Sequence, residues 1–292
     1  MVKIDVQKCS KCGLCIMVCK HGFISFQKPN DYPKIDEDAA KNCSKCGHCT
    51  AICPKDAVTY DGYNPLECVE TANHQDIPHD RFDLFLRSRR TCRNFRKEPV
   101  PGETIARIVN SVKYSPTAKN SQGVKIAVVD GHKKVQELAG ITFEFYKGLA
   151  DMVANPFKRF FMSLLIGRSD VATIREVSSM ILEGYEKWKA GTDLLFYEAP
   201  VIIVTYSEKT MPMPKDDCDY ALFSMALTAE NLGLGTCING FLLKASEHSK
   251  EIRNFFGLKN DEQFFGAMAL GFPSVKFRKT VSREPLCIKY IK

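Results

Sequence analysis

Eight of the thirteen cysteines lie within the first 53 residues, and their spacing suits metal ligation. They form two runs, Cys9–Cys19 and Cys43–Cys53, each with the pattern C-x2-C-x2-C-x3-C. The other five cysteines are scattered without such spacing, and no export signal is evident. Without export a disulfide framework is not expected, so metal ligation is the leading interpretation of the first eight.

The two runs are halves of an internal repeat. They superpose at an offset of 34 residues, and Ile24–Phe26 then falls on Val58–Tyr60. Each half is predicted to be a cysteine loop, a short helical turn and a short strand. We expect the two strands to pair with each other around a pseudo-twofold axis.

The chemistry that this spacing favours is a pair of [4Fe–4S] clusters. Three closely spaced thiolates bind three irons of one cubane, and the fourth cysteine of the run ligates the other cluster. The spacing thus predicts one cluster on Cys9, Cys12, Cys15 and Cys53, and a second on Cys43, Cys46, Cys49 and Cys19. A pair of structural zinc sites is the alternative. Zinc usually takes two separated C-x2-C pairs and does not explain a triple with a crossing fourth cysteine.

Residues 1–62 resemble the two-cluster bacterial ferredoxins. Gly13 and Gly47 stand at matched positions, where a residue without a side chain leaves room for backbone beside a cubane. Lys20 follows Cys19 where the family usually has the proline that Pro54 supplies in the second half. That difference leaves the ligand set intact.

Composition excludes several classes of function. The chain has 292 residues, 26% of them charged, and a formal charge of +7, which is too small and scattered to indicate nucleic-acid binding. The longest apolar run, near 194–206, is interrupted by Glu198 and Pro200 and is too short for a membrane span. A cytoplasmic protein is therefore expected, with no membrane partner.

A second domain is predicted after residue 80. Residues 63–80 carry glycine, proline and polar residues without a hydrophobic period, so we expect a linker there. Residues 81–292 are predicted to form an α+β domain, a central sheet flanked by helices. Helices are expected over 105–112, 132–190 and 217–232, and strands over 124–129, 201–206 and 264–270. Gly233 and Gly235 are predicted to end the third helix.

The most informative stretch of this domain is Arg89-Arg90-Thr91-Cys92-Arg93-Asn94-Phe95. Guanidinium groups beside a hydroxyl can grip a phosphate through bidentate hydrogen bonds, although a solvated basic turn has the same composition. The segment resembles the R-R-S-x-R-x-F signature of the nitroreductase family. Further elements resembling that family follow in order: residues 115–122, Gly233-Leu-Gly-Thr-Cys237, Gly271-Phe-Pro273, and the basic tail Lys279 to Leu286.

The resemblance implies an FMN site at the interface of a homodimer. It implies that Arg89, Arg90 and Thr91 hold the phosphate and ribityl chain, with Arg283 and Lys279 closing on the phosphate. Two residues are expected at the reacting edge and are the catalytic candidates. Arg93 should lie near flavin N1 and O2, and Thr236, with Gly235, should lie near N5 and O4. Contributions from the partner subunit are implied for Pro116, Thr117 and Asn120.

Residues 143–190 leave one question open. The aromatic residues Phe157, Phe160, Phe161 and Trp188 could form a substrate lid, but aromatic residues at helical spacing more often belong to a core. A core position is therefore the expectation.

The expected function is an iron–sulfur flavoprotein oxidoreductase. Clusters relay single electrons from reduced ferredoxin or a similar low-potential donor to FMN, which reduces a small conjugated acceptor such as a nitroaromatic, a quinone or an activated alkene. One alternative is an NAD(P)H-dependent nitro or flavin reductase with accessory clusters. Another is a non-enzymatic protein for redox sensing or electron storage.

Overall fold

The computed structural model describes residues 2–71, 76–165 and 167–292, and the chain divides into two compact units. The first comprises residues 1–77 with 119–121, and the second comprises 78–118 with 122–292. The predicted linker, 63–80, lies partly outside the described residues, at 72–75. Within it, a 3-10 helix spans Pro65–Glu67 and α4 (His79–Ser88) has already begun.

The first unit consists of short elements around the cysteine loops. Both halves contain the predicted loop, helical turn and strand. The elements in chain order are β1 (Val2–Ile4), α1 (Leu14–Val18), β2 (Ile24–Ser25), β3 (Lys34–Ile35), α2 (Glu37–Ala40), α3 (His48–Ala51) and β4 (Val58–Tyr60).

The expected pairing of the two repeat strands is wrong. β2 does not pair with β4: β1 pairs antiparallel with β4, and β2 pairs antiparallel with β3. The strand that leads into each cysteine loop therefore pairs with the strand that leaves the other loop. The two halves are therefore still related by their strand pairing, because each small sheet takes one strand from each half.

The second unit is the predicted α+β domain. Its sheet has the order β5-β6-β8-β7, and all neighbouring strands are antiparallel. Its strands are β5 (Lys125–Asp130), β6 (Val201–Glu208), β7 (Gly235–Ile238) and β8 (Glu262–Gly271). Its helices after α4 are α5 (Gly102–Asn110), α6 (His132–Ala154), α7 (Pro156–Leu165), α8 (Arg168–Lys189), α9 (Pro214–Asn231), α10 (Gly240–His248) and α11 (Lys250–Phe255), with 3-10 turns at Ser111–Tyr114 and Ala118–Asn120.

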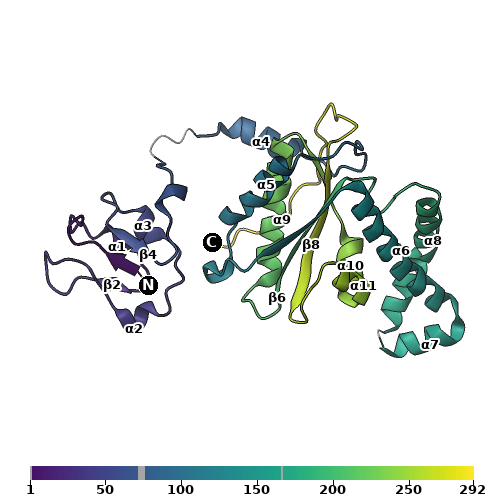
Figure 1. Cartoon of the computed structure of the whole chain (residues 1–292), viewed down its shortest axis with the longest axis horizontal. Helices are drawn as coiled ribbons and strands as arrows, with labels where there is room; N and C mark the ends of the chain where they lie inside the picture. Colours follow the sequence, from purple (N-terminus) through teal and green to yellow (C-terminus); the bar gives the residue numbers. More distant parts are fainter. Residues whose placement is uncertain (1, 72–75, 166) are drawn as a thin grey trace. The chain divides into compact units, whose positions relative to one another are not determined.

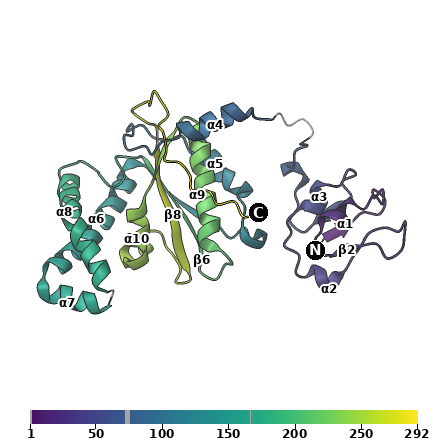
Figure 2. The same ribbon diagram turned by 180° about the vertical axis from the view of Figure 1, so that it is seen from behind.

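Helices cover both faces of this sheet. α5 and α9 lie on one face, and α10, α11 and the start of α6 lie on the other (Figure 1; Figure 2 shows the same arrangement from behind). β6 is buried on both faces because its side chains alternate between two cores. Ile202 and Val204 pack toward α6 and α10, whereas Val201 and Ile203 pack toward α5 and α9.

The predicted strands and helices of this domain are confirmed, with one difference after the end of α9. Gly233 has a φ of 79° and follows the helix, as a left-handed terminating residue should. Gly235 instead begins β7, a strand that the prediction missed. β7 has only four residues, two of them glycine and threonine, so its local pattern carries little strand signal.

The aromatic residues of the 143–190 region divide into two groups. Trp188 packs against Phe143 and Tyr185, as expected of a core residue. The core expectation is wrong for Phe157, Phe160 and Phe161, whose exposed fractions are 73%, 59% and 50%. They lie on the outer side of α7, a helix that packs on α6 and α8.

No helix among the described residues is both long enough and apolar enough to cross a membrane.

Candidate cluster and flavin sites

The eight cysteines of the first unit line two separate cavities, and the grouping crosses between the loops. Cys19 lines one cavity, of about 290 Å³, together with three cysteines of the second loop. Cys53 lines the other, a narrower space of about 10 Å³, together with three cysteines of the first loop. The cysteine sets are Cys19, Cys43, Cys46 and Cys49 for the larger cavity, and Cys9, Cys12, Cys15 and Cys53 for the smaller.

The donor set suits a cluster better than a single metal ion. Each cysteine of a cubane bonds a different iron, so the ligands surround a cavity, whereas zinc would hold every sulfur about 2.3 Å from one point. Among the described residues, no three histidine, cysteine, aspartate or glutamate side chains gather closely enough to share one metal ion.

The backbone of the two cysteine loops follows the same path. Lys11 and Lys45 are left-handed, with φ of 62° and 52°, and each donates its backbone N–H to the sulfur two residues earlier, at 3.4 Å. Gly13 and Gly47 have φ of 75° and 76°, a conformation that glycine adopts without strain. N–H donors aimed at cysteine sulfur are the usual surroundings of an iron–sulfur cluster.

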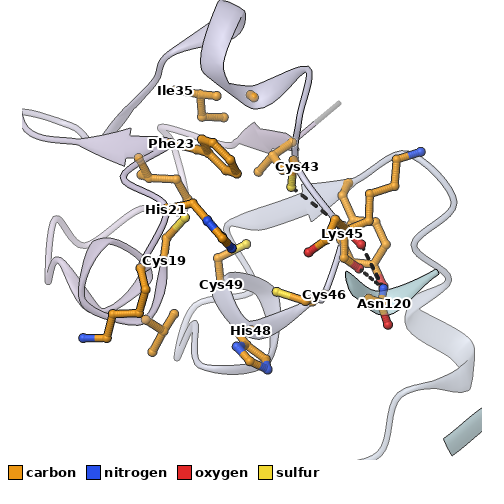
Figure 3. A pocket seen from close by; sticks show the side chains of 18 of the residues that line it. Cys19, His21, Phe23, Ile35, Cys43, Lys45, Cys46, His48, Cys49 and Asn120 are labelled. Atoms are coloured by element: carbon orange, nitrogen blue, oxygen red, sulfur yellow. Dashed lines mark hydrogen bonds between the residues drawn. The ribbon is translucent and has the colours of Figure 1, made fainter. Parts of the chain in front are cut away.

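Figure 3 shows the larger cavity and the side chains around it. The imidazole of His21 stacks on Phe23 at 5.3 Å and extends into the space between Cys19 and Cys49. The imidazole of His48 points away from that space. The Asn120 amide donates to the carbonyls of Ser44 and Lys45, at 2.9 and 3.2 Å, and residues 119–121 accordingly belong to the first unit.

The arginine segment 89–95 runs along the free edge of β7. Thr91 forms a parallel bridge with Thr236, and the backbone N–H of Cys92 donates to the Thr236 carbonyl at 2.8 Å. At its other end, Phe95 forms an antiparallel bridge with Pro273. These contacts bring together three of the elements that resemble the nitroreductase family, which are far apart in the sequence.

Glycine at 235 is required by this close approach. A Cβ at Gly235 would lie 2.6 Å from Cβ and 2.8 Å from Sγ of Cys92. Cys92 and Cys237 are both buried, and burial raises the pKa of each thiol, so neither is an activated thiolate.

Arg90 fits a bound anion. Its Nη2 atom is buried and has no hydrogen-bond partner in the part of the chain that the structure describes, while Nη1 donates to the Arg89 carbonyl at 3.4 Å. An unpaired buried guanidinium nitrogen is costly unless a ligand pairs with it. Arg89 lies beside Glu230, where burial raises the carboxyl pKa and the arginine charge opposes that rise.

The two catalytic candidates differ in their surroundings. The Arg93 guanidinium lies 5.9 Å from the centre of the Tyr197 ring, and its charge opposes the burial that raises the pKa of Cys237. Arg93 is exposed, whereas Thr236 is 3% exposed.

The basic tail supplies one further cavity. Lys279 and Arg278 line a space of about 470 Å³ with Arg81 and Ser88 of α4, immediately before Arg89. Three cations around one space suit a phosphate. Arg283 lies further along the same exposed segment, which forms no helix or strand.

The three residues expected to reach FMN from the partner subunit fall in different units. Pro116 and Thr117 belong to the second unit, where the Thr117 hydroxyl accepts the Gln122 N–H at 3.1 Å. Asn120 belongs to the first. Lys119, Asn120 and Gln122 all have positive φ, between 48° and 56°, a strained backbone of the kind that gathers at functional sites.

Sequence reasoning missed several residues of these sites. His21 escaped notice because its matched residue is Lys55, so the repeat does not mark it. Arg81 and Ser88 lie in a helix that the expected linker partly covered. The arginine motif includes Cys92 but does not predict its approach to Gly235, because that approach is a tertiary contact.

Comparison with known proteins agrees with both units. Residues 86–272 match the model of the nitroreductase family, and residues 8–57 match that of the 4Fe-4S dicluster domain. Chloronitrobenzene nitroreductase of Comamonas testosteroni is 24% identical over 203 residues, 65% of this chain and 86% of that protein. 4-Nitrobenzoate reductase of Pseudomonas putida is 25% identical over 210 residues, 66% and 86% of the two chains.

A solved structure shares the fold of the second unit. It is a nitroreductase with bound FMN from Desulfitobacterium hafniense, 21% identical, with a TM-score of 0.50 over 72% of this chain and 97% of that one. The family model covers well over half of the residues. The chain therefore belongs to the nitroreductase family and carries an N-terminal 4Fe-4S dicluster domain.

Proposed function

We propose that the protein is an FMN-dependent oxidoreductase whose two [4Fe–4S] clusters relay electrons to the flavin. The observation that carries this proposal is the crossed grouping of eight cysteines around two cavities, on the same chain as a nitroreductase domain. Clusters exchange electrons one at a time, and a flavin exchanges them singly or in pairs as a hydride.

The proposed ligands are the two sets of four cysteines that line the cavities. Cys9, Cys12, Cys15 and Cys53 hold one cluster, and Cys19, Cys43, Cys46 and Cys49 hold the other. The left-handed turns at Gly13 and Gly47 shape the two loops, and backbone N–H groups donate to the cysteine sulfurs.

The residues proposed to bind FMN contact different parts of the cofactor. Arg89, Arg90 and Thr91 hold the phosphate and ribityl chain, and Lys279 and Arg283 close on the phosphate. The unpaired Nη2 atom of Arg90 and the cations around the Lys279 cavity support this assignment.

At the reacting edge, Arg93 places a positive charge beside N1 and O2, which stabilises the flavin when it is reduced and anionic. Gly235 and Thr236 approach N5 and O4. The hydrogen bond between Cys92 and Thr236 fixes the arginine segment against β7, so both sides of this edge are positioned together.

A homodimer with the flavin at its interface is part of the proposal. The outer side of α9 supports it, because Tyr220 and Phe223 are exposed there while the opposite side of the helix packs on the sheet. Large apolar side chains at helical spacing on an exposed face are typical of a subunit interface. Pro116, Thr117 and Asn120 are the residues proposed to reach the partner's flavin.

The proposed acceptor is a small conjugated molecule, and nitroaromatic compounds are its first candidates. The two curated relatives are named for the reduction of chloronitrobenzene and 4-nitrobenzoate. The proposed donor is reduced ferredoxin or a similar low-potential carrier, and the proposed location is the cytoplasm.

The experiment is stopped-flow reduction of the bound flavin by reduced ferredoxin without oxygen. The wild type is compared with Cys12→Ser and Cys46→Ser, one variant for each cluster, and Cys68→Ser is the control outside both sets. Flavin reduction should slow at least tenfold in the first two variants and stay unchanged in the third. Equal rates in all four proteins would refute the relay.

Anaerobic titration with NADH and NADPH tests the alternative donor. Rapid, complete flavin reduction by either nucleotide in the Cys12→Ser and Cys46→Ser variants would make the clusters accessory. Failure of every candidate acceptor to reoxidise the reduced flavin would favour an electron-storage role.

A further inference from the structure

The two cavities of the first unit differ in what surrounds their cysteines. The larger cavity is lined by His21, Lys20 and Lys45, besides its four cysteines, and by His48, whose imidazole points away from the space (Figure 3). None of the described residues that line the smaller cavity is charged, and none is a histidine. The internal repeat would have made the two sites equivalent, so the differences identify positions where the halves have diverged.

His21 is the first such position. It stacks on Phe23 with an angle of 15° between the rings, and this contact orients the imidazole, which is exposed and lines the cavity (Figure 3). Its matched residue, Lys55, does not line the smaller cavity. An imidazole N–H directed at a cluster sulfur stabilises the reduced cluster, because reduction adds negative charge to the sulfurs.

The lysines are the second difference. Lys20 follows Cys19, whereas Pro54 follows Cys53 at the matched position. Lys45 lines the larger cavity, whereas its matched residue Lys11 is engaged elsewhere: its ammonium donates to the Asn30 carbonyl at 3.1 Å and lies 4.2 Å from the centre of the Tyr32 ring.

Several contacts act in the opposite direction. The backbone N–H of Ala57 donates to Cys53 at 3.3 Å, and Leu14 and Ser10 form hydrogen bonds to Cys12, so these contacts stabilise the reduced state of the cluster in the smaller cavity. They are dipoles. Against them stand one imidazole donor and the charges of two exposed lysines, of which Lys45 lies near the Asp61 carboxylate, and a charge acts over a longer range than a dipole.

We propose that the cluster held by Cys19, Cys43, Cys46 and Cys49 has the higher reduction potential of the two, and that His21 is the main cause. An electron that enters at either cluster then comes to rest on this one. This inference rests on the proposed function, which supplies both clusters, and it adds the order of their reduction potentials.

The potentials can be measured one cluster at a time. Cys12→Ser leaves the Cys19 cluster with its full ligand set, and Cys46→Ser leaves the Cys9 cluster with its own. Each protein is titrated potentiometrically with detection by electron paramagnetic resonance, and the iron content is determined first. All variants are titrated in the same buffer at one pH.

The Cys19 cluster should be reduced at the higher potential. In the Cys12→Ser background, His21→Phe keeps the ring that packs on Phe23 but removes the N–H. It should lower the ratio of reduced to oxidised cluster at fixed potential by about tenfold, the effect of losing one hydrogen bond to a charged group. Lys20→Gln should lower it by about threefold, since an exposed charge is screened.

His48→Phe is the matched control, because its imidazole points away from the cavity, and it should change the ratio by less than twofold. In the Cys46→Ser background His21→Phe should have no effect. Equal potentials, or a higher potential for the Cys9 cluster, would overturn the proposal. If the Cys19 cluster has the higher potential but His21→Phe leaves that potential unchanged, the role of His21 is overturned. Iron content below that of one cluster would count against the ligand assignment of the proposed function instead.

Discussion

The Nη2 atom of Arg90 is buried without a hydrogen-bond partner among the described residues. A buried donor without an acceptor costs about 1–3 kcal/mol, and a phosphate would remove that cost. Arg90 should therefore affect the stability of the apoprotein and the affinity for FMN in opposite directions.

Arg90→Met tests this expectation. FMN affinity should fall about 10- to 100-fold, which corresponds to the loss of a charge-assisted hydrogen bond, while the apoprotein unfolds at the same or a higher temperature. Fluorescence titration with FMN and thermal unfolding of the apoprotein measure the two quantities. Arg107→Met, at an exposed position of α5, is the control and should leave FMN affinity unchanged. A variant that binds FMN normally would remove Arg90 from the phosphate site.

The second prediction at the scale of single residues concerns the close approach of Gly235 to Cys92. Gly235→Ala places a Cβ 2.6 Å from that of Cys92 and should separate the arginine segment from β7, at a cost of about 1–3 kcal/mol. Chemical unfolding should show this loss, and FMN affinity should fall with it. Gly240→Ala is the matched control, since a Cβ there meets no atom within 4 Å. Equal stability of the two variants would contradict the argument.

At the scale of elements, three strands are joined by ion pairs at one end of the sheet. Lys125 of β5 contacts Glu208 of β6 at 3.0 Å and Glu262 of β8 at 2.8 Å. The hydrogen bond from Lys125 lowers the pKa of Glu262. A carboxylate with a lowered pKa stabilises the fold above the ordinary carboxyl range, and this contribution is lost as the pH falls through that range.

Glu262→Gln should therefore destabilise the protein in a pH-dependent manner. The free energy of unfolding should fall by about 1 kcal/mol at pH 7, and the difference from wild type should shrink below about pH 4. Urea unfolding at several pH values measures it. Glu208→Gln should cost less, because the Glu208 side chain is 41% exposed against 7% for Glu262. A loss that is independent of pH would show that packing, not charge, is responsible.

The elements also show what the sequence could predict. Cysteine spacing encodes cluster chemistry directly, so the eight cysteines and their crossed grouping could be proposed without a structure. Strand pairing could not be predicted, because β1 and β3 have only three and two residues. Their partners are set by the path of the chain between the two halves. The orientation of His21 depends on its stacking with Phe23, and no spacing rule records such a contact.

At the scale of the whole molecule, the exposed side of α9 predicts the oligomeric state. Phe223→Glu places a charge in the proposed interface and should convert the homodimer into monomers that retain little FMN, since the flavin site is proposed to need both subunits. Size-exclusion chromatography with light scattering measures the mass. Leu66→Glu, at a residue that is 93% exposed in the first unit, should remain dimeric. A monomeric wild type that binds FMN would contradict the proposed interface.

The crossed arrangement of strands and cysteines has a consequence for the origin of the first unit. A single half, with one cysteine run and two short strands, has three ligands for one cluster, a fourth for another, and no strand partner of its own. Two copies of such a peptide, related by a twofold axis, would complete both sites and both small sheets. The ancestor is then expected to have been a symmetric dimer of a peptide about half this size, and gene duplication freed each copy to acquire its own residues, such as His21 and Lys20.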